Sequence, residues 1–217
     1  MFAYCGNNPV NRIDPTGNLW WQIFLVALCI ASEAALITGV NHMVAYKNHS
    51  KNSAVDSDTS TSTNNKIIND QNGTTGKNFE VGDHSASYNS CGAIAIHNAK
   101  VHSGIDSTLS DTIADLQTSG AMIGVTGSFG FNPYAFSSVL KASGLSYTPI
   151  SLADMSNAGL YVITYWNSDN LMDGAHTVAV FFDGTTYVTY NYSGNGTPGY
   201  LSPFDYAENF IYGYQVG

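Results

Sequence analysis

Residues 91–102 read CGAIAIHNAKVH. The apolar side chains of this stretch are Ala93, Ile94, Ile96, Ala99 and Val101. Their spacing predicts a mostly buried helix that begins at Cys91, with Ser90 as its candidate N-cap. Further helices are predicted over residues 107–118, which place apolar residues on one face, and over 133–143, which open with a proline.

The pattern changes after residue 145. Residues 160–166, 176–182, 186–192 and 210–216 are rich in β-branched and aromatic side chains, which favours strands. Asp183-Gly184 separates two of these runs and is a hairpin signal. Helices followed by antiparallel strands predict an α+β fold in which the N-terminal helices pack on an antiparallel sheet.

Charge divides the 217-residue chain near residue 78. Residues 1–78 carry five basic and five acidic side chains, whereas residues 79–217 carry two basic and eleven acidic ones. The whole net charge of -9 therefore belongs to the second part. A basic patch for nucleic acid is not expected from this balance.

Residues 47–78 are dominated by Asn, Ser, Thr, Asp and Gly. Such a segment buries too little apolar surface to offset its ordering entropy, so it is interpreted as a polar linker between two parts. The alternative is an arm that lies along the surface of the second part. Residues 79–217 are then the folded domain.

Residues 19–46 are predicted to be a hydrophobic helical segment. Its apolar core, residues 19–40, has 22 residues and one charged side chain, Glu33. This length is enough to span a bilayer, although an ionisable group in hydrocarbon is costly. The segment can instead be a helix buried against the domain, or a stretch enclosed in a larger carrier. Cys29 is interpreted as a small apolar residue of this helix.

Residues 1–17 read MFAYCGNNPVNRIDPTG, with turn signals at Asn8-Pro9 and Asp14-Pro15. The pattern Pro-x4-Asp-Pro-x-Gly, from Pro9 to Gly17, resembles the last motif of the RHS (YD-repeat) core. The resemblance implies that residues 1–18 end such a core, that Cys5 belongs to its closing strand, and that the remainder is a variable toxin or effector cassette.

Three side chains of the second part suggest nucleophilic chemistry: Cys91, His176 and Asn191. A thiol at a helix N-terminus has a lowered pKa, because the dipole and unpaired N–H groups stabilise the thiolate. Gly92 is expected to leave the backbone open to a substrate. His176 begins a strand and can accept the thiol proton. Asn191, across the hairpin, is expected to bind the second ring nitrogen through its side chain.

The motifs around these residues resemble the papain-like cysteine peptidase superfamily, with bacteriocin leader peptidase-like domains as the nearest branch. They are Ser-Cys-Gly-Ala at 90–93, Gly-Ala-His-Thr-Val-Ala-Val at 174–180 and Tyr-Asn-Tyr at 190–192. The resemblance implies a Cys91–His176–Asn191 triad. These families place a glutamine about six residues before the nucleophile to bind the oxyanion, and residues 78–91 contain none. Asn89 is the nearest amide and is the candidate, with His84 and Ser85 as alternatives.

Together these features predict a cysteine peptidase-like effector of an RHS-type protein that cleaves a protein amide, or that deamidates or transglutaminates a glutamine. The resemblance implies a protein or peptide substrate, a cognate immunity protein, and secretion by a bacterium or delivery into a target cell. No cofactor is expected, and no metal, because the spacing of His97 and His102 from Cys91 on a helix excludes a shared zinc ion. The alternatives are a catalytically inactive binding domain and a membrane-active toxin that acts through residues 19–40.

Overall fold

The computed structural model describes residues 18–58, 61–123, 125–127, 129–167, 174–207 and 209–217, and the side chains of 18–37, Thr74 and Val125 lie outside this description. The chain divides into two compact units, Met1–Gly39 and Val40–Gly217. Helix α1, Asn18–Ser57, begins in the first unit and ends in the second.

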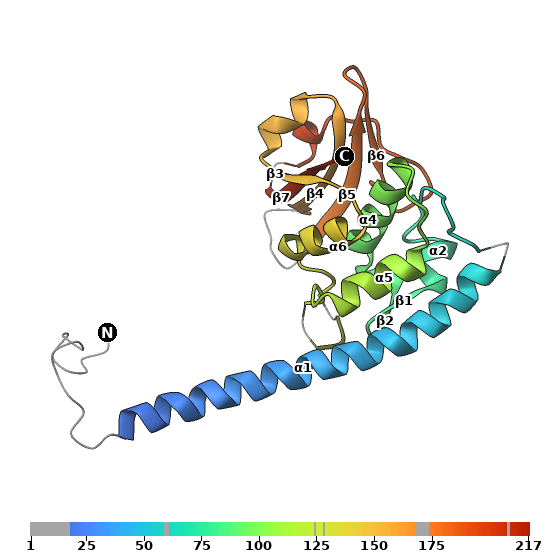
Figure 1. The fold of residues 1–217 in the computed structure, drawn as a ribbon. Coiled ribbons are helices and arrows are strands. Elements are labelled where there is room, and N and C mark those ends of the chain that lie inside the picture. Colours follow the sequence, from blue (N-terminus) through green and yellow to red (C-terminus); the bar gives the residue numbers. More distant parts are fainter. Residues whose placement is uncertain (1–17, 59–60, 124, 128, 168–173, 208) are drawn as a thin grey trace. The chain divides into compact units, whose positions relative to one another are not determined.

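A five-stranded antiparallel sheet, with strand order β3-β7-β4-β5-β6, organises this unit (Figure 1). The strands are β3 Tyr147–Ile150, β4 Gly159–Trp166, β5 Ala175–Phe182, β6 Tyr187–Tyr190 and β7 Phe210–Val216. The four predicted strands and the Asp183-Gly184 hairpin are confirmed. The sequence did not indicate β3, a short edge strand whose Pro149 would be out of place in a central strand.

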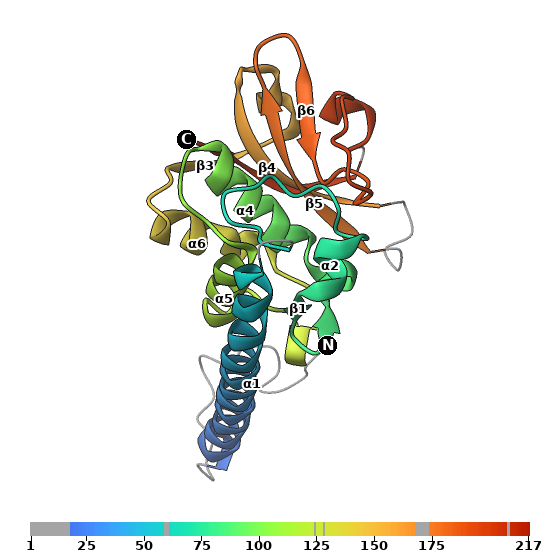
Figure 2. The same ribbon diagram turned by 90° about the vertical axis from the view of Figure 1, so that its right-hand side faces the viewer.

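Helices cover one face of the sheet. Helix α4, Cys91–His102, packs against β5 and against α5, Leu109–Thr118, while α6, Phe136–Ala142, follows a short 3-10 turn over Pro133–Ala135 (Figure 2). The three predicted helices and the α+β class are therefore confirmed. This side of the sheet shares one apolar core with α4, α5 and α6, which includes Ile94, Ile96, Leu116, Leu140 and Val162.

The opposite face of the sheet has a core of its own. It contains Met155, from the 3-10 segment Leu152–Ser156, together with Tyr161, Ile163, Val178 and Val180. Because β4 is covered on both faces, its side chains from Leu160 to Tyr165 are all buried. A strand covered on both faces reads as a continuous apolar run rather than an alternating one.

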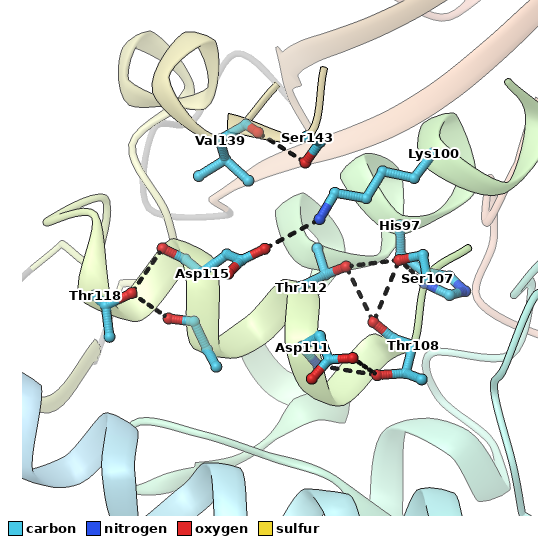
Figure 3. Close-up of polar contacts among 11 residues, drawn as sticks. His97, Lys100, Ser107, Thr108, Asp111, Thr112, Asp115, Thr118, Val139 and Ser143 are labelled. Carbon is cyan, nitrogen blue, oxygen red and sulfur yellow. Dashed lines mark hydrogen bonds and ion pairs between the residues drawn. The ribbon is translucent and has the colours of Figure 1, made fainter. Parts of the chain in front are cut away.

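Polar side chains join α4 to α5 (Figure 3). Lys100, almost fully buried on α4, extends to the carboxylate of Asp115 on α5, with 3.1 Å between Nζ and Oδ2. His97 is fully buried and its Nδ1 lies 3.1 Å from the hydroxyl of Ser107. His97 is thus a buried packing residue of α4.

The predicted linker 47–78 differs most from the structure. Its first eleven residues continue α1, and Ile68 is buried in the main core. The amide of Asn98 binds both backbone polar groups of Ile68, at 2.8 Å each. Hydrogen bonds, more than buried apolar area, attach this segment to the rest of the unit. Its polar composition therefore did not mean that it is a linker. The contact boundary lies between Gly39 and Val40, not near residue 78. The alternative of a surface arm is nearer to what is observed.

Helices α2 and α3 complete the unit at its N-terminal side. Helix α2 spans Thr74–Asn78 and α3 spans Ala86–Asn89, and between them lie the paired two-residue strands β1, Glu80–Val81, and β2, His84–Ser85. Helix α3 leads directly into α4 through Ser90. This short connection fixes where the polypeptide presents Cys91.

Within the described part of the chain, no helix combines the length and apolar character needed to cross a membrane. The side chains of residues 18–37, including Cys29, lie outside the description, so the three interpretations of the apolar stretch stay open. Residues 1–17, with Cys5 and the RHS-like motif, also lie outside the described residues.

Candidate active site

Cys91 and His176 line the same cleft, which has a volume of about 570 Å³. Its walls come from four places in the chain: residues 71–72, Ser87, Tyr88 and Cys91 at the α3–α4 junction, the paired ends of β4 and β5, and residues 192–194 with Tyr206. The described residues that line it include no Asp, Glu, Lys or Arg. The described lining is therefore polar but not charged, apart from the Cys–His pair.

Cys91 is the first residue of α4 and is partly exposed. Burial raises the pKa of its thiol, but a hydrogen bond and charge interaction with His176, together with the backbone N–H groups of Thr177 and Gly92, outweigh this, so the pKa is lowered. Ser90 occupies the N-cap position as predicted, yet its hydroxyl does not cap the helix. The first turn of α4 instead directs an N–H group to the sulfur.

His176 lies near the start of β5, opposite Tyr165 on β4. Its Nε2 is 2.9 Å from the backbone carbonyl oxygen of Asn191. A carbonyl only accepts, so Nε2 carries a proton and Nδ1 is the nitrogen left for Cys91. Burial lowers the pKa of His176, but the interaction with Cys91 and the carbonyls of Asn191 and Tyr192 raise it overall. Opposite shifts of the two groups favour a thiolate–imidazolium pair.

Asn191 lies in the turn after β6, fully buried and with a left-handed φ of 60°. The structure brings it to His176, but the expected side-chain contact is wrong. The Asn191 amide instead pairs with Gln71: its Nδ2 donates to Oε1 at 2.9 Å, and its Oδ1 accepts from the Gln71 N–H at 3.3 Å. Only the main chain of Asn191 binds the imidazole, a role that its residue type did not indicate.

Asn89, the candidate oxyanion donor, is placed elsewhere. Its Nδ2 donates to the carbonyls of Gly127, at 2.7 Å, and Val81, at 3.3 Å, so both amide protons are engaged. The residue is buried and does not line the cleft. The oxyanion prediction for Asn89 is therefore wrong, because the amide holds two backbone segments together beneath α3.

Gln71 is a residue of the cleft that the sequence did not indicate. It lies twenty residues before Cys91, in the segment interpreted as a linker, but lines the same cleft. Its Nε2 donates to the carbonyl of Ser87 at 3.3 Å, and its Oε1 accepts from Asn191. No local sequence pattern reveals this residue, because only the folding of the chain places it in the same cleft as Cys91.

Gly92 serves packing rather than substrate access. A Cβ at this position would lie 2.8 Å from the ring of Phe136 and 3.4 Å from Cβ of Phe131, and the residue is buried. The expectation that Gly92 opens the backbone to a substrate is therefore wrong. The glycine lets the start of α4 pack closely on the aromatic side chains of the helical core.

Three tyrosines form one wall of the cleft. Tyr165 and Tyr206 have ring centroids 5.4 Å apart, and Tyr192 and Tyr206 are 4.9 Å apart. Burial raises the pKa of Tyr165 and that of Tyr206, so both hydroxyls stay protonated near neutral pH. The wall thus offers aromatic faces and neutral hydroxyl groups, a surface suited to uncharged side chains.

No group of three or more His, Cys, Asp or Glu side chains in the described part of the molecule is arranged to hold a metal ion. His102 packs on Phe181 and its Nδ1 lies 3.2 Å from the hydroxyl of Tyr190.

No protein-family model matches the chain, and no curated protein matches it either.

Proposed function

We propose that the second unit is a papain-like cysteine peptidase domain that hydrolyses a protein amide, with Cys91 as nucleophile and His176 as general base and acid. The contact between Cys91 and His176, with the thiol pKa lowered and the imidazole pKa raised, carries this proposal. Their position in one open cleft supports it. The catalytic unit includes residues 61–78, because Gln71 lines the cleft.

The reaction uses water as its only co-substrate. The Cys91 thiolate attacks the amide carbon and forms a C–S bond, while the C=O electron pair moves to oxygen. When the C–N bond breaks, the His176 imidazolium gives its proton to the leaving nitrogen. Water then adds to the thioester as His176 takes one of its protons, and cleavage of the C–S bond releases a carboxylic acid and the thiolate.

The negative oxygen of the intermediate needs donors in the cleft. The backbone N–H of Cys91, in the first turn of α4, supplies one. We infer that the side-chain amide of Gln71 supplies the second, because Gln71 lines the cleft and its Nε2, which donates to Ser87, carries a second proton. Gln71 thereby replaces the glutamine that the resemblance led us to seek closer to the nucleophile.

The substrate is a neutral or weakly basic segment of a protein or peptide. The described lining of the cleft has no charged side chain to bind a strongly charged residue, and the acidic domain disfavours an acidic partner. Attack on a glutamine side chain instead of a peptide bond would release ammonia by the same steps. In the context implied by residues 1–17, the domain is the effector cassette of an RHS-type protein, neutralised in the producing cell by an immunity protein.

The test combines a thiol-reactive probe with a peptide library. Labelling of Cys91 in the full chain, located by mass spectrometry, is expected to exceed that of a model thiol near neutral pH. Peptides incubated with the protein should show new termini for hydrolysis, or a mass gain of about 1 Da at glutamine for deamidation, since the amide nitrogen is replaced by oxygen.

Cys91→Ala should abolish both signals, whereas Cys29→Ala, the matched control at another thiol, should not. If Cys91 reacts no faster than a model thiol, the enzyme proposal fails and the inactive binding domain is favoured. If target-cell effects survive removal of residues 79–217, the toxin acts through residues 19–40 instead.

A further inference from the structure

Residues 69–72, here called the strap, bind the turn that follows β6. The side-chain oxygen of Asn69 accepts from the N–H of Asn191 at 2.7 Å, and its backbone carbonyl accepts from the N–H of Gly196 at 2.7 Å. The Asn72 N–H donates to the carbonyl of Gly194 at 2.9 Å. Two segments separated by about 120 residues in the chain are thus joined by main-chain and amide hydrogen bonds.

Every polar group of Asn191 has a partner in this arrangement. The strap binds its backbone N–H through Asn69 and both ends of its amide through Gln71. Its remaining group, the carbonyl, lies 2.9 Å from Nε2 of His176. Because Asn191 is fully buried and has a φ of 60°, its carbonyl direction depends on these bonds rather than on a regular strand.

The same strap is attached to the nucleophile side of the cleft. The Gln71 amide donates to the carbonyl of Ser87 in α3, four residues before Cys91. The strap therefore contacts both the segment that leads to the thiol and the turn that holds the imidazole. A displacement of the strap would change the position of His176 relative to Cys91.

We propose that the strap is a positioning element of the active site, and that Asn69 and the amide of Asn191 aim the Asn191 carbonyl at Nε2 of His176. This inference rests on the proposed function. In this arrangement the main-chain carbonyl of Asn191 orients the imidazole of His176, and the strap holds that carbonyl in place. Asn191 is therefore a positioning residue. The carbonyl keeps the proton on Nε2 and directs Nδ1 to Cys91.

Cys91 is the ionisable group that interacts most strongly with His176, and the ring of Tyr165 lies 5.9 Å from the imidazole, edge to face. The described lining of the cleft contributes no carboxylate or ammonium group that would titrate beside them. The pH profile of Cys91 alkylation therefore reports how well His176 is held. Iodoacetamide, with the Cys91 peptide followed by mass spectrometry, gives this profile in the full chain.

The informative variants are Asn69→Ala and Asn191→Gly. Asn191→Gly keeps the carbonyl and tolerates the positive φ, but removes the amide pair with Gln71. Each variant is expected to lower the alkylation rate near pH 7 by about tenfold, the factor that one ordinary hydrogen bond represents. Asn69→Asp, which retains an acceptor for the Asn191 N–H, should restore most of the rate and tests the role if Asn69→Ala folds poorly.

Asn65→Gly is the matched control. Asn65 also has a positive φ, of 52°, and also binds backbone, accepting from the N–H of Ser107 at 2.9 Å, but it does not contact the turn after β6. Its profile should match that of the wild type. The inference is supported if the Cys91 alkylation rates of Asn69→Ala and Asn191→Gly near pH 7 lie between those of the wild type and His176→Ala.

Two results would overturn the inference alone. In one, wild-type reactivity depends on His176 while both strap variants keep the wild-type profile. In the other, Asn191→Gly is as slow as His176→Ala while Asn69→Ala keeps the wild-type profile, which would assign the role to the Asn191 side chain and not to the strap. A wild-type profile equal to that of a model thiol and unchanged in His176→Ala would instead overturn the proposed function and this inference with it.

Discussion

Asn98→Ala tests whether residues 61–72 belong to the folded unit. Asn98 on α4 is fully buried and binds the N–H and the carbonyl of Ile68, both at 2.8 Å. The substitution removes both bonds and leaves two backbone groups without these partners, at a site where Ile68 itself is buried. Each orphaned group costs roughly 1–3 kcal/mol, so the loss of two should lower the free energy of unfolding by roughly 2–6 kcal/mol.

This loss is large beside a typical domain stability of about 5–15 kcal/mol. Urea unfolding of the full chain, followed by circular dichroism, measures it as a lower midpoint. Asn157→Ala is the matched control, because Asn157 is exposed and its amide makes one long bond, 3.3 Å, to a backbone carbonyl. The control should change the free energy of unfolding by less than about 0.5 kcal/mol.

Hydrogen exchange gives a local measure of the same attachment. The Ile68 amide proton should be protected in the wild type and should exchange faster in Asn98→Ala, because its acceptor has been removed. If the substitution costs no more than the control, or if the Ile68 amide exchanges in the wild type as fast as an unstructured one, the segment is a linker and the packing argument fails.

Three further predictions concern the active site and the start of α4. Cys91→Ala should lower the pKa of His176, because burial disfavours the imidazolium and the thiolate partner is lost; in the wild type the imidazole therefore stays protonated to a higher pH. NMR titration of the ring measures both pKa values, and equal values would contradict the pairing. Gly92→Ala should lower the free energy of unfolding by about 1–3 kcal/mol, because the new Cβ would lie 2.8 Å from the ring of Phe136. An unchanged midpoint of urea unfolding would show that the ring moves aside freely. Gln71→Leu removes the proposed oxyanion donor and should lower kcat by about 10²–10³-fold. A KM effect with unchanged kcat would argue against that role.

Local sequence patterns were sufficient for α4, α5, α6 and four strands of the five-stranded sheet, but they did not indicate α2, α3, β1 or β2. The apolar spacing of residues 91–102 corresponds to α4, and the aromatic and β-branched runs correspond to four of the five strands. These predictions succeed because helix and strand periodicity is a property of neighbouring residues. Strand β3 was not predicted, because a four-residue strand that contains a proline has little periodic signal in the sequence.

The polar segment 47–78 shows where composition fails. A low apolar content predicts disorder when a segment must be stabilised by its own burial. Here hydrogen bonds, among them those of the Asn98 amide, and the apolar side chains of Val55 and Ile68 attach it to the second unit. Such bonds depend on partners about 30 residues away, and sequence composition carries no information about them.

The sequence by itself determined the α+β class, the position of Cys91 at the start of a helix and that of His176 at the start of a strand, because these follow from local periodicity and turn chemistry. Only the tertiary structure decided the partners of that pair. The folding of the chain brings Gln71 to the cleft, sends the Asn89 amide to two backbone carbonyls, and assigns the Asn191 carbonyl to the imidazole. The physical reason is that a buried amide binds whichever donors and acceptors the fold places around it, and main-chain carbonyls, which every residue carries, leave no mark in a sequence.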